Sequence, residues 1–203
     1  GSQIGNWARE LGFDFDADAK LTPPKPTIAI PASGQLLRFV NHGVGGQRDS
    51  LQFDGNSWLD LPAFRSPRVA GGRSLQIKGK IRPLSKSGVI LAHGDRQAGY
   101  SIYLDQGHLC FATCAKTKRT IVRTPDQIQG LVPFQATWSP KGEIFLKING
   151  KLVARSTADV IQRQPDDSMQ IGADLHQPVG DYTTPNPFSG IIEDLSFRYP
   201  NGN

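Results

Sequence analysis

The sequence has no long hydrophobic run and little cysteine. No apolar stretch in the 203 residues approaches the ~18–20 needed to cross a bilayer, so we expect no membrane span. Its two cysteines are Cys110 and Cys114. Residues four apart on one face of a strand lie roughly 13 Å from each other, which is beyond disulfide reach. We therefore expect two free thiols, and a lone CxxxC pair lacks the further ligands of a structural zinc site.

The sequence also lacks the carboxylate and histidine patterns of hydrolases. Glycosidases need two carboxyl groups that flank the scissile bond, whereas the three glutamates here are scattered along the chain. Glu193 and Asp194 are adjacent, so we expect their side chains on opposite faces of a strand. The four histidines show no HxH or HExxH spacing that would suggest zinc. We therefore do not expect the chain to be an enzyme.

The remaining composition is that of a folded domain with a basic surface. Hydrophobic residues make up 37% and charged residues 20% of the chain, which is too apolar for disorder. The formal net charge is +5 and the pI about 9.4, and this balance favours anionic partners. Because the basic residues are not interleaved with aromatic ones, as in platforms for single-stranded nucleic acid, we expect no nucleic-acid partner.

Two regions of the chain differ in pattern. Residues 1–33 hold four prolines between Pro23 and Pro31, and we expect a Pro-rich N-terminal segment or linker to a covalently attached partner domain. Residues 34–203 consist of short alternating runs separated by Gly, Pro, Asp and Asn. The expected strands are 51–53, 58–61, 74–82, 89–93, 100–104, 108–115, 120–123, 134–138, 144–148, 152–156, 169–172 and 191–199. Asn149-Gly150 is the strongest hairpin signal. Strands at this spacing, with almost no helical pattern, predict an all-β sandwich or barrel.

The order of these runs also resembles a known family. The most specific pieces are FDG at residues 53–55, INGK at residues 148–151 and FSGIIEDLSF at residues 188–197. From about Leu36 to Arg198 the sequence is similar to the concanavalin A-like, laminin G-type domains, including their bacterial branch. The resemblance implies a two-sheet antiparallel jelly-roll sandwich that binds glycan or protein at a loop rim or on a concave face. Members usually carry a Trp followed by His within the segment 132–138, whereas here the Trp comes late, at Trp138.

The resemblance further implies a calcium ion at the rim of the sandwich. The family holds this ion with a carboxylate near the start of one strand, backbone carbonyls and a second acidic group. The first position falls on Gly99 here, and Asp95 is the candidate substitute. The second position falls near Asp166 and Asp167. Two carboxylates with carbonyls and water would supply enough hard oxygen ligands, and the alternative is that these are loop aspartates that favour turns.

Basic and aromatic side chains supply the candidate glycan site. The candidate ligand-binding residues are Lys78, Lys80, Arg82, Lys116, Lys118, Arg119 and Tyr182. Three of the cations alternate along one strand and three occupy a later hairpin. Such clusters pair well with sulfate or carboxylate groups, and the alternative is a solvated back of a sheet. Tyr182, in a loop rich in Gly and Pro, is expected to be exposed, whereas Trp58, Tyr100 and Tyr103 are expected in the core.

These observations lead to one expected function and two alternatives. We expect a non-catalytic carbohydrate-binding module, with a sulfated polysaccharide as the favoured ligand. It would be the accessory domain of a larger exported hydrolase, such as a sulfatase or glycosidase, and therefore secreted or periplasmic. One alternative is a stand-alone glycoside hydrolase or sulfatase-associated domain, which would show paired carboxylates in a groove. The other is a protein-interaction or adhesion module, which would show a broad apolar patch.

Overall fold

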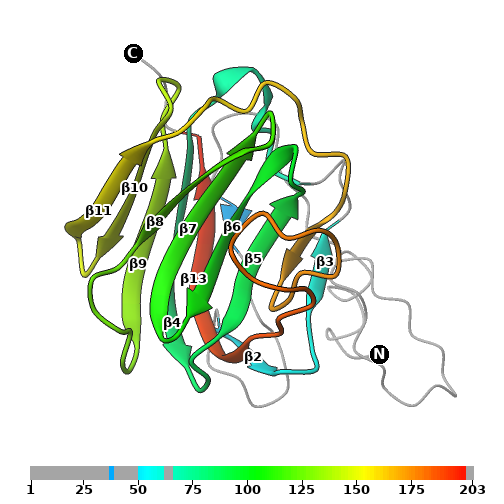
Figure 1. Ribbon diagram of the computed structural model, residues 1–203. Coiled ribbons are helices and arrows are strands. Elements are labelled where there is room, and N and C mark those ends of the chain that lie inside the picture. The colour runs from blue at the N-terminus through cyan, green and yellow to red at the C-terminus, as the bar shows by residue number, and fades with distance from the viewer. Residues whose placement is uncertain (1–36, 39–49, 62–65, 200–203) are drawn as a thin grey trace, which may run out of the picture.

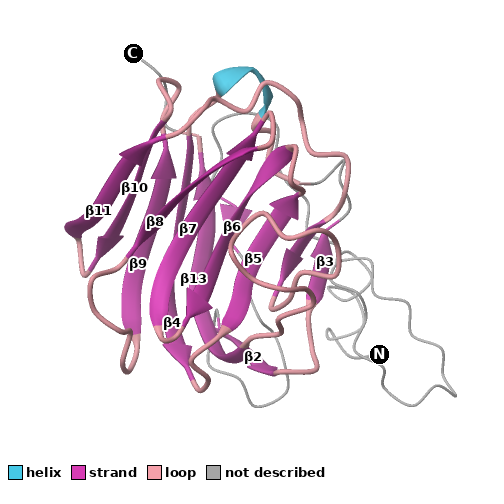
Figure 2. Ribbon diagram, in the orientation of Figure 1, coloured by secondary structure: helices cyan, strands magenta, loops and turns pink. Residues whose placement is uncertain are grey.

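The computed structural model, which describes residues 37–38, 50–61 and 66–199, consists of two antiparallel β-sheets packed face to face (Figure 1, Figure 2). The seven-stranded sheet has the order β1-β13-β4-β9-β10-β11, and β2 also pairs with β13. The six-stranded sheet has the order β3-β12-β5-β6-β7-β8. The expected all-β, two-sheet antiparallel jelly-roll sandwich is therefore confirmed.

The strands follow the expected runs closely. The seven-stranded sheet contains β1 (Leu37–Arg38), β2 (Ser50–Asp54), β4 (Leu75–Pro83), β9 (Val132–Trp138), β10 (Glu143–Ile148), β11 (Lys151–Thr157) and β13 (Ser189–Arg198). The six-stranded sheet contains β3 (Leu59–Leu61), β5 (Gly88–Gly94), β6 (Ala98–Asp105), β7 (His108–Ala115), β8 (Lys118–Arg123) and β12 (Met169–Ile171). Among the described residues the only helical element is the short 3-10 turn η2 (Ala70–Gly72), so no helix there could cross a membrane.

Alternation along the strands builds the core between the two sheets. In β4 the side chains of Leu75, Ile77 and Ile81 are buried, whereas the intervening Lys78 and Arg82 are exposed. Since burying one such apolar side chain contributes about 1.5–3 kcal/mol, the inward-facing residues of both sheets are the main source of stability. The late tryptophan, Trp138, is fully buried at the end of β9 and belongs to this core.

Three hairpins use two-residue turns in which both residues have positive φ. They are Gln106 and Gly107 (49° and 85°), Lys116 and Thr117 (51° and 68°), and Asn149 and Gly150 (51° and 78°). This is the backbone of a type I′ turn, whose twist matches that of the flanking strands. The Asn149-Gly150 hairpin is confirmed, and Lys116-Thr117 differs from the other two because no glycine is present.

The loop from β12 to β13, residues 172–188, crosses the outer face of the six-stranded sheet in front of β5 and β6 (Figure 1). We call it the covering loop. Beneath it lies a second apolar cluster formed by Val89, Ala92, Tyr103, Cys110, Ala112, Cys114 and Val179, with Ile121 and Tyr182 packed against it. Both cysteines are buried free thiols, as expected. The outer face of this sheet is therefore filled by the protein's own residues.

The expected division into residues 1–33 and 34–203 falls on a part of the chain outside the described residues. The N-terminal linker and its partner domain stay predictions.

Candidate functional site

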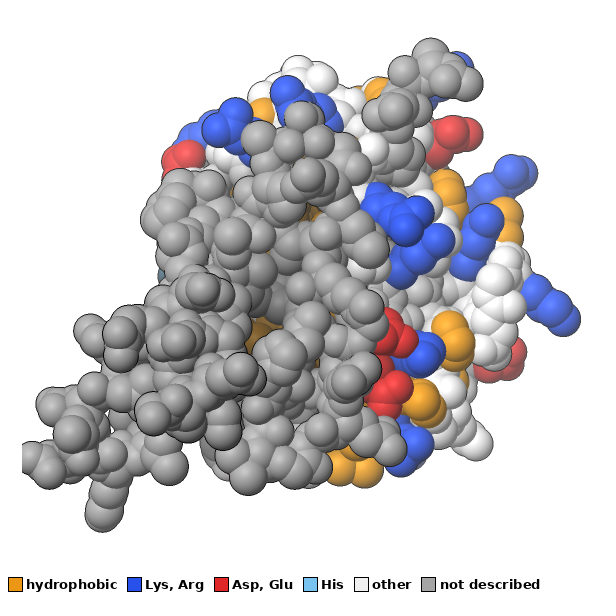
Figure 3. Space-filling model, turned by 180° about the vertical axis from the view of Figure 1, so that it is seen from behind, with side chains coloured by type: hydrophobic (Ala, Val, Ile, Leu, Met, Phe, Trp, Pro, Cys, Tyr) orange, Lys and Arg blue, Asp and Glu red, His pale blue; other side chains and the backbone are white. Residues whose placement is uncertain are grey.

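The outer face of the seven-stranded sheet carries the three predicted basic residues of β4 and three further cations. We call it the basic face, and its cations are Lys78, Lys80, Arg82, Lys147, Arg155 and Arg198. The strand register places them next to each other: Lys78 lies opposite Gln135, and Gln135 lies opposite Lys147. Figure 3 shows basic side chains gathered on this face beside the residues drawn in grey.

Five of the six cations on the basic face form no ion pair within the described part of the chain. The exception is Lys80, whose Nζ lies 2.7 Å from Oδ2 of Asp194. The hydrogen bond and the charge of Asp194 raise the pKa of Lys80. The side chains of the described residues therefore leave most of the positive charge on this face uncompensated.

An open groove of about 570 Å³ runs over strands β10 and β11 at one side of the basic face. Its lining includes Phe145, Lys147, Leu152 and Arg155. The Nζ of Lys147 lies 5.7 Å from the centroid of the Phe145 ring, within the range of a cation–π interaction. The groove therefore offers an apolar surface flanked by two cations and by the carboxylate of Glu143.

The expectation that Glu193 and Asp194 point to opposite faces is wrong. The pairing of β13 with β4 shifts register between Glu193 and Ser196, and Asp194 has a positive φ of 52°. Glu193 lies opposite Lys80, and this irregularity turns Asp194 to the same lysine. The two carboxylates thus share the basic face, where Asp194 is committed to an ion pair.

The predicted hairpin cations have three different environments. Lys118 pairs with Asp159 at 3.4 Å, and both side chains are about half exposed. Arg119 donates a hydrogen bond from Nη1 to the carbonyl oxygen of Gly180 at 2.8 Å and forms an ion pair with Asp181 at 2.5 Å. Arg119 therefore anchors the covering loop. Lys116, at the turn, forms no ion pair with any described residue.

Tyr182 is half-buried, against the expectation of an exposed ring. Its hydroxyl donates a hydrogen bond to Oδ2 of Asp174 at 2.7 Å, and its ring lies 4.8 Å from that of Tyr103. The hydroxyl of Tyr103 accepts a hydrogen bond from the backbone N–H of Asp181 at 3.1 Å. Burial raises the pKa of both tyrosines. Tyr182 thus packs the covering loop onto the sheet.

Of the three other predictions about aromatic residues, two are confirmed and one is wrong. Tyr100 and Tyr103 are buried in the sandwich as expected. Trp58 is 46% exposed, so the expectation that it belongs to the core is wrong.

The three predicted calcium ligands do come together at the rim, in a pocket of about 120 Å³ that Asp95, Asp166 and Asp167 all line. Oδ1 of Asp95 accepts hydrogen bonds from the backbone N–H groups of Gln97 and Ala98, at 2.7 and 3.1 Å. Burial, reinforced by the charge of Asp95, raises the pKa of Asp167.

As arranged, these residues do not fit a calcium ion. Oδ1 of Asp167 accepts a hydrogen bond from the backbone N–H of Gly94 at 2.9 Å, and Asp166 forms an ion pair with Arg163, which lines the same pocket. No group of three His, Cys, Asp or Glu within the described ranges is placed to hold a metal. A guanidinium in the pocket repels a divalent cation. Calcium therefore stays a prediction and has no part in the function proposed below.

The covering loop also gives a physical reason for glycine at the first calcium position. A Cβ on Gly99 would lie 2.6 Å from the carbonyl oxygen of His93 and 2.8 Å from a methyl carbon of Val179. No side chain, and so no carboxylate, fits at this position.

Comparison with known proteins identifies the architecture. No protein-family model matches the sequence, and no curated protein matches it. Among solved structures, domains LG4-5 of the mouse laminin alpha1 chain match with a TM-score of 0.62 and 18% identity, over 81% of this chain and 47% of that chain. The fold is the laminin G-like, concanavalin A-like sandwich. A heptameric SAP-like pentraxin from Limulus polyphemus has a TM-score of 0.52 and 19% identity, over 73% of this chain and 75% of that one.

A further neighbour in fold is a toxin domain. The binding domain of botulinum neurotoxin DC, in complex with SialylT, matches with a TM-score of 0.58 and 14% identity, over 83% of this chain and 43% of that one. The chain spans about half the length of the laminin structure that it matches. Identities this low establish the laminin G-like fold alone, and function has to be argued from the site.

Sequence reasoning missed Lys147, Arg155 and Arg198 on the basic face and Arg163 at the rim. Alternation within β10 already indicated that Lys147 and Phe145 share a face. Only the strand order, however, shows that this face continues that of Lys78.

Proposed function

We propose that this chain is a non-catalytic binding module for an anionic polysaccharide, which lies across the basic face. The observation that carries the proposal is the group of five cations without ion-pair partners among the described residues, on one face of one sheet. Arg and Lys side chains pair well with sulfate and carboxylate groups. The solved neighbours that are binding domains, including one in complex with SialylT, support a binding role over a catalytic one.

The spacing of the cations supports a repeating ligand. Lys78, Lys80 and Arg82 alternate along β4, so neighbours in this row stand roughly 7 Å apart. Lys78 and Lys147 are two strands apart in one register row, which corresponds to roughly 10 Å. A grid of charges at such distances suits a chain with an acidic group on successive sugars better than it suits a single small anion.

Charge rather than ring stacking would supply most of the affinity. Phe145 is the one aromatic side chain in the groove lining, and Lys147 lies over its ring. The cations are exposed, and an exposed ion pair contributes about 0.2–1 kcal/mol and is weakened by salt. Several such pairs formed together would give useful affinity that falls steeply as ionic strength rises, as for other polyanions.

Immobilised dextran sulfate, with neutral dextran as its counterpart, tests the proposal by surface plasmon resonance at 50 and 200 mM NaCl. We expect binding to dextran sulfate alone and a marked loss at the higher salt concentration. The triple variant Lys78→Gln, Lys147→Gln, Arg155→Gln should bind about 3- to 150-fold more weakly, since it removes three exposed ion pairs that contribute about 0.2–1 kcal/mol each. The single variants Lys78→Gln and Lys86→Gln form a matched pair whose affinities for dextran sulfate are compared. Lys86 is an exposed lysine in the β4–β5 turn.

Equal binding to both dextrans, or an equal effect of Lys78→Gln and Lys86→Gln, would contradict the proposal. The finer expectations, that the natural ligand is sulfated and that the module is secreted as part of an exported hydrolase, are part of the proposal and rest on the sequence.

A further inference from the structure

Residues 177–184 of the covering loop lie over the outer face of β5 and β6 but form no backbone hydrogen bond with a strand in the described part of the chain (Figure 1). The two ends of the loop are tied more firmly. The backbone N–H of Phe188 donates to the carbonyl oxygen of Gly172 at 2.8 Å, and that of Asp174 donates to the carbonyl oxygen of Pro185 at 3.0 Å. A loop whose ends are joined in this way can leave the sheet without disturbing β12 or β13.

Side chains of the sheet hold this part of the loop in place. Arg119 of β8 donates a hydrogen bond to the carbonyl oxygen of Gly180 and forms an ion pair with Asp181. The hydroxyl of Tyr103 accepts a hydrogen bond from the Asp181 N–H. The Arg119 and Asp181 side chains are 39% and 64% exposed, so water and salt weaken their attraction. Because strands β5 to β8 keep their own hydrogen-bonded ladders without these contacts, residues 177–184 should open at a lower free energy than the whole sandwich unfolds.

Both free thiols lie beneath this part of the loop, in one cluster with Val179. Cys114 is opposite Gly99 in the β6–β7 ladder, and a Cβ on Gly99 would lie 2.8 Å from a methyl carbon of Val179. Cys110 is opposite Tyr103, whose hydroxyl holds the loop backbone. Each cysteine is 2% exposed. The loop thus closes the side of the sheet from which a reagent would reach either sulfur.

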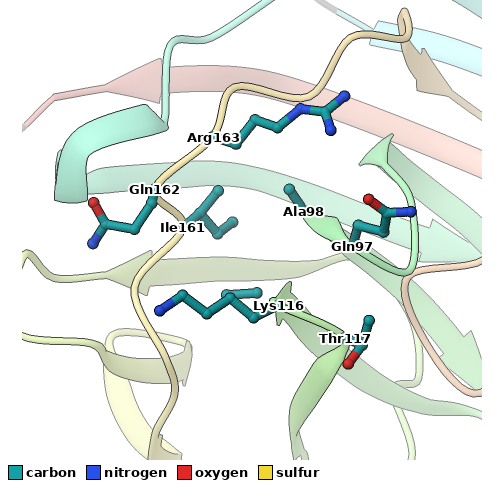
Figure 4. A pocket seen from close by; sticks show the side chains of 8 residues that line it. Gln97, Ala98, Lys116, Thr117, Ile161, Gln162 and Arg163 are labelled. Atoms are coloured by element: carbon teal, nitrogen blue, oxygen red, sulfur yellow. The ribbon is translucent and has the colours of Figure 1, made fainter.

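The end of the sandwich offers no second route to the thiols. The Sγ of Cys114 donates a hydrogen bond to the carbonyl oxygen of Arg96, in the β5–β6 turn, at 2.9 Å. Figure 4 shows that turn, the β7–β8 turn and the segment after β11 meeting around Ala98 and Ile161. These two residues are 8% and 0% exposed. Opening of the covering loop is therefore the direct route.

The closed loop has no room for an enlarged cysteine side chain. A Cβ on Gly180 would overlap the rings of Tyr103 and Tyr182. The space at Gly99 rejects a Cβ as well. Burial raises the pKa of Cys110 to about 11, so the closed state also keeps this group as the unreactive thiol.

We propose that residues 177–184 form a redox-sensitive lid, which opens on the intact sandwich and is held open when a low-molecular-weight disulfide modifies a thiol beneath it. In the open state the thiolate of Cys110 or Cys114 attacks one sulfur of the reagent. The S–S bond of the reagent breaks, a mixed disulfide with the protein forms, and the other half of the reagent leaves as a thiolate. The added group keeps the lid from closing until a thiol reductant removes it. This device is separate from the basic face and does not depend on the function proposed above.

The rate of thiol modification by 4,4′-dithiodipyridine, a neutral disulfide, measures lid opening. The variants Cys110→Ala and Cys114→Ala report the two thiols one at a time. Gly180→Ala wedges the lid without a change in charge and should raise the rate about 5- to 150-fold, the range expected when an extra carbon is forced into a packed site. In urea the wild-type rate should rise less steeply than global unfolding does, since the open state exposes little surface.

Asp181→Asn and Asp105→Asn form a matched pair for the ion pair that holds the lid. Asp105 pairs with Arg123 of β8 at 2.8 Å, with side chains of similar exposure. The charges of both aspartates raise the pKa of Cys110, so the two variants change the electrostatics of that thiol in the same direction. Only Asp181→Asn loosens the lid, and it should react about two- to fivefold faster than Asp105→Asn, as the loss of one exposed ion pair implies.

Hydrogen exchange at the Asp181 amide tests whether modification holds the lid open. Exchange there should be at least about tenfold faster in the modified protein and should return to its original rate with dithiothreitol, while the amides of β6 and β7 stay protected. Three results would each overturn the proposal. They are thiol modification with the full urea dependence of global unfolding, equal rates for Asp181→Asn and Asp105→Asn or for Gly180→Ala and wild type, and an Asp181 amide that stays protected after modification.

Discussion

Stability below neutral pH is the most direct test of the packing in this sandwich, because one histidine is buried in its core. His93 is 1% exposed at the end of β5. Its Nδ1 lies 3.3 Å from the hydroxyl oxygen of Tyr100, and its Nε2 has no hydrogen-bond partner among the described residues. Burial lowers the pKa of His93 from 6.5 to about 4.

The sign and size of the effect follow from this pKa. Because the folded-state pKa lies below that of the unfolded chain, protonation favours unfolding. The stability is fully present above pH 6.5 and is lost as the pH falls towards 4. One pKa unit corresponds to about 1.36 kcal/mol. His93 should therefore cost the wild-type protein about 2 kcal/mol between pH 7 and pH 5, and about 3 kcal/mol by pH 4.

Urea unfolding at pH 7 and pH 5 measures this difference. His93→Gln removes this titrating group, so the loss of stability between pH 7 and pH 5 should be about 2 kcal/mol smaller in the variant than in the wild-type protein. Asp167 and Asp174, whose pKa values are raised by burial, act in the opposite direction but are present in both proteins. The exposed His176, changed to Gln, is the comparison and should alter the loss much less than His93→Gln, since His176 acts only through the pKa values of Asp167 and Asp174, which its charge lowers. The same change in the free energy of unfolding between pH 7 and pH 5 for wild type and His93→Gln would refute the reasoning.

Two further predictions concern the rim. Lys116 and Thr117 of the β7–β8 turn both have positive φ, 51° and 68°, which is strained for residues with a Cβ. The double variant Lys116→Asn, Thr117→Gly gives this turn the residues of the β10–β11 hairpin, so it should stabilise the fold by about 1 kcal/mol. An unchanged urea midpoint would show that the turn is not strained. Gly99→Ala places a Cβ 2.6 Å from the carbonyl oxygen of His93 and should cost about 1–3 kcal/mol in urea unfolding. Wild-type stability of this variant would contradict the close packing of Gly99 against His93 and against Val179 of the covering loop.

Local patterns predicted the strands well because burial on one face imposes a period of two. The run from Leu75 to Pro83 is a strand with its lysines outside, and Asn149-Gly150 turns as expected. The irregularity in β13 was not predictable in this way. Asp194 leaves the alternation through a positive φ, and the partner that holds it there, Lys80, is remote in sequence.

Contacts between distant segments account for the rest of what sequence reasoning missed. Arg119 was a reasonable ligand candidate by charge, yet Asp181 in the covering loop binds it. Tyr182 stood in a loop rich in Gly and Pro, which suggested exposure, yet Asp174 and Tyr103 fix it against the sheet. Each of these pairings depends on how the covering loop folds back, and no local pattern encodes that path.

The covering loop also limits which surfaces of the sandwich can contact a ligand. A sandwich has two outer faces, and here the loop fills one of them with its own side chains, using Arg119 and Tyr182 to do so. Among the described residues, the basic face and the rim are exposed, and cations outnumber aromatic rings there. If the proposed function is correct, aromatic stacking contributes little on these two surfaces, and discrimination between glycans comes from their acidic groups. The same architecture would make binding sensitive to salt and tolerant of changes in neutral sugars.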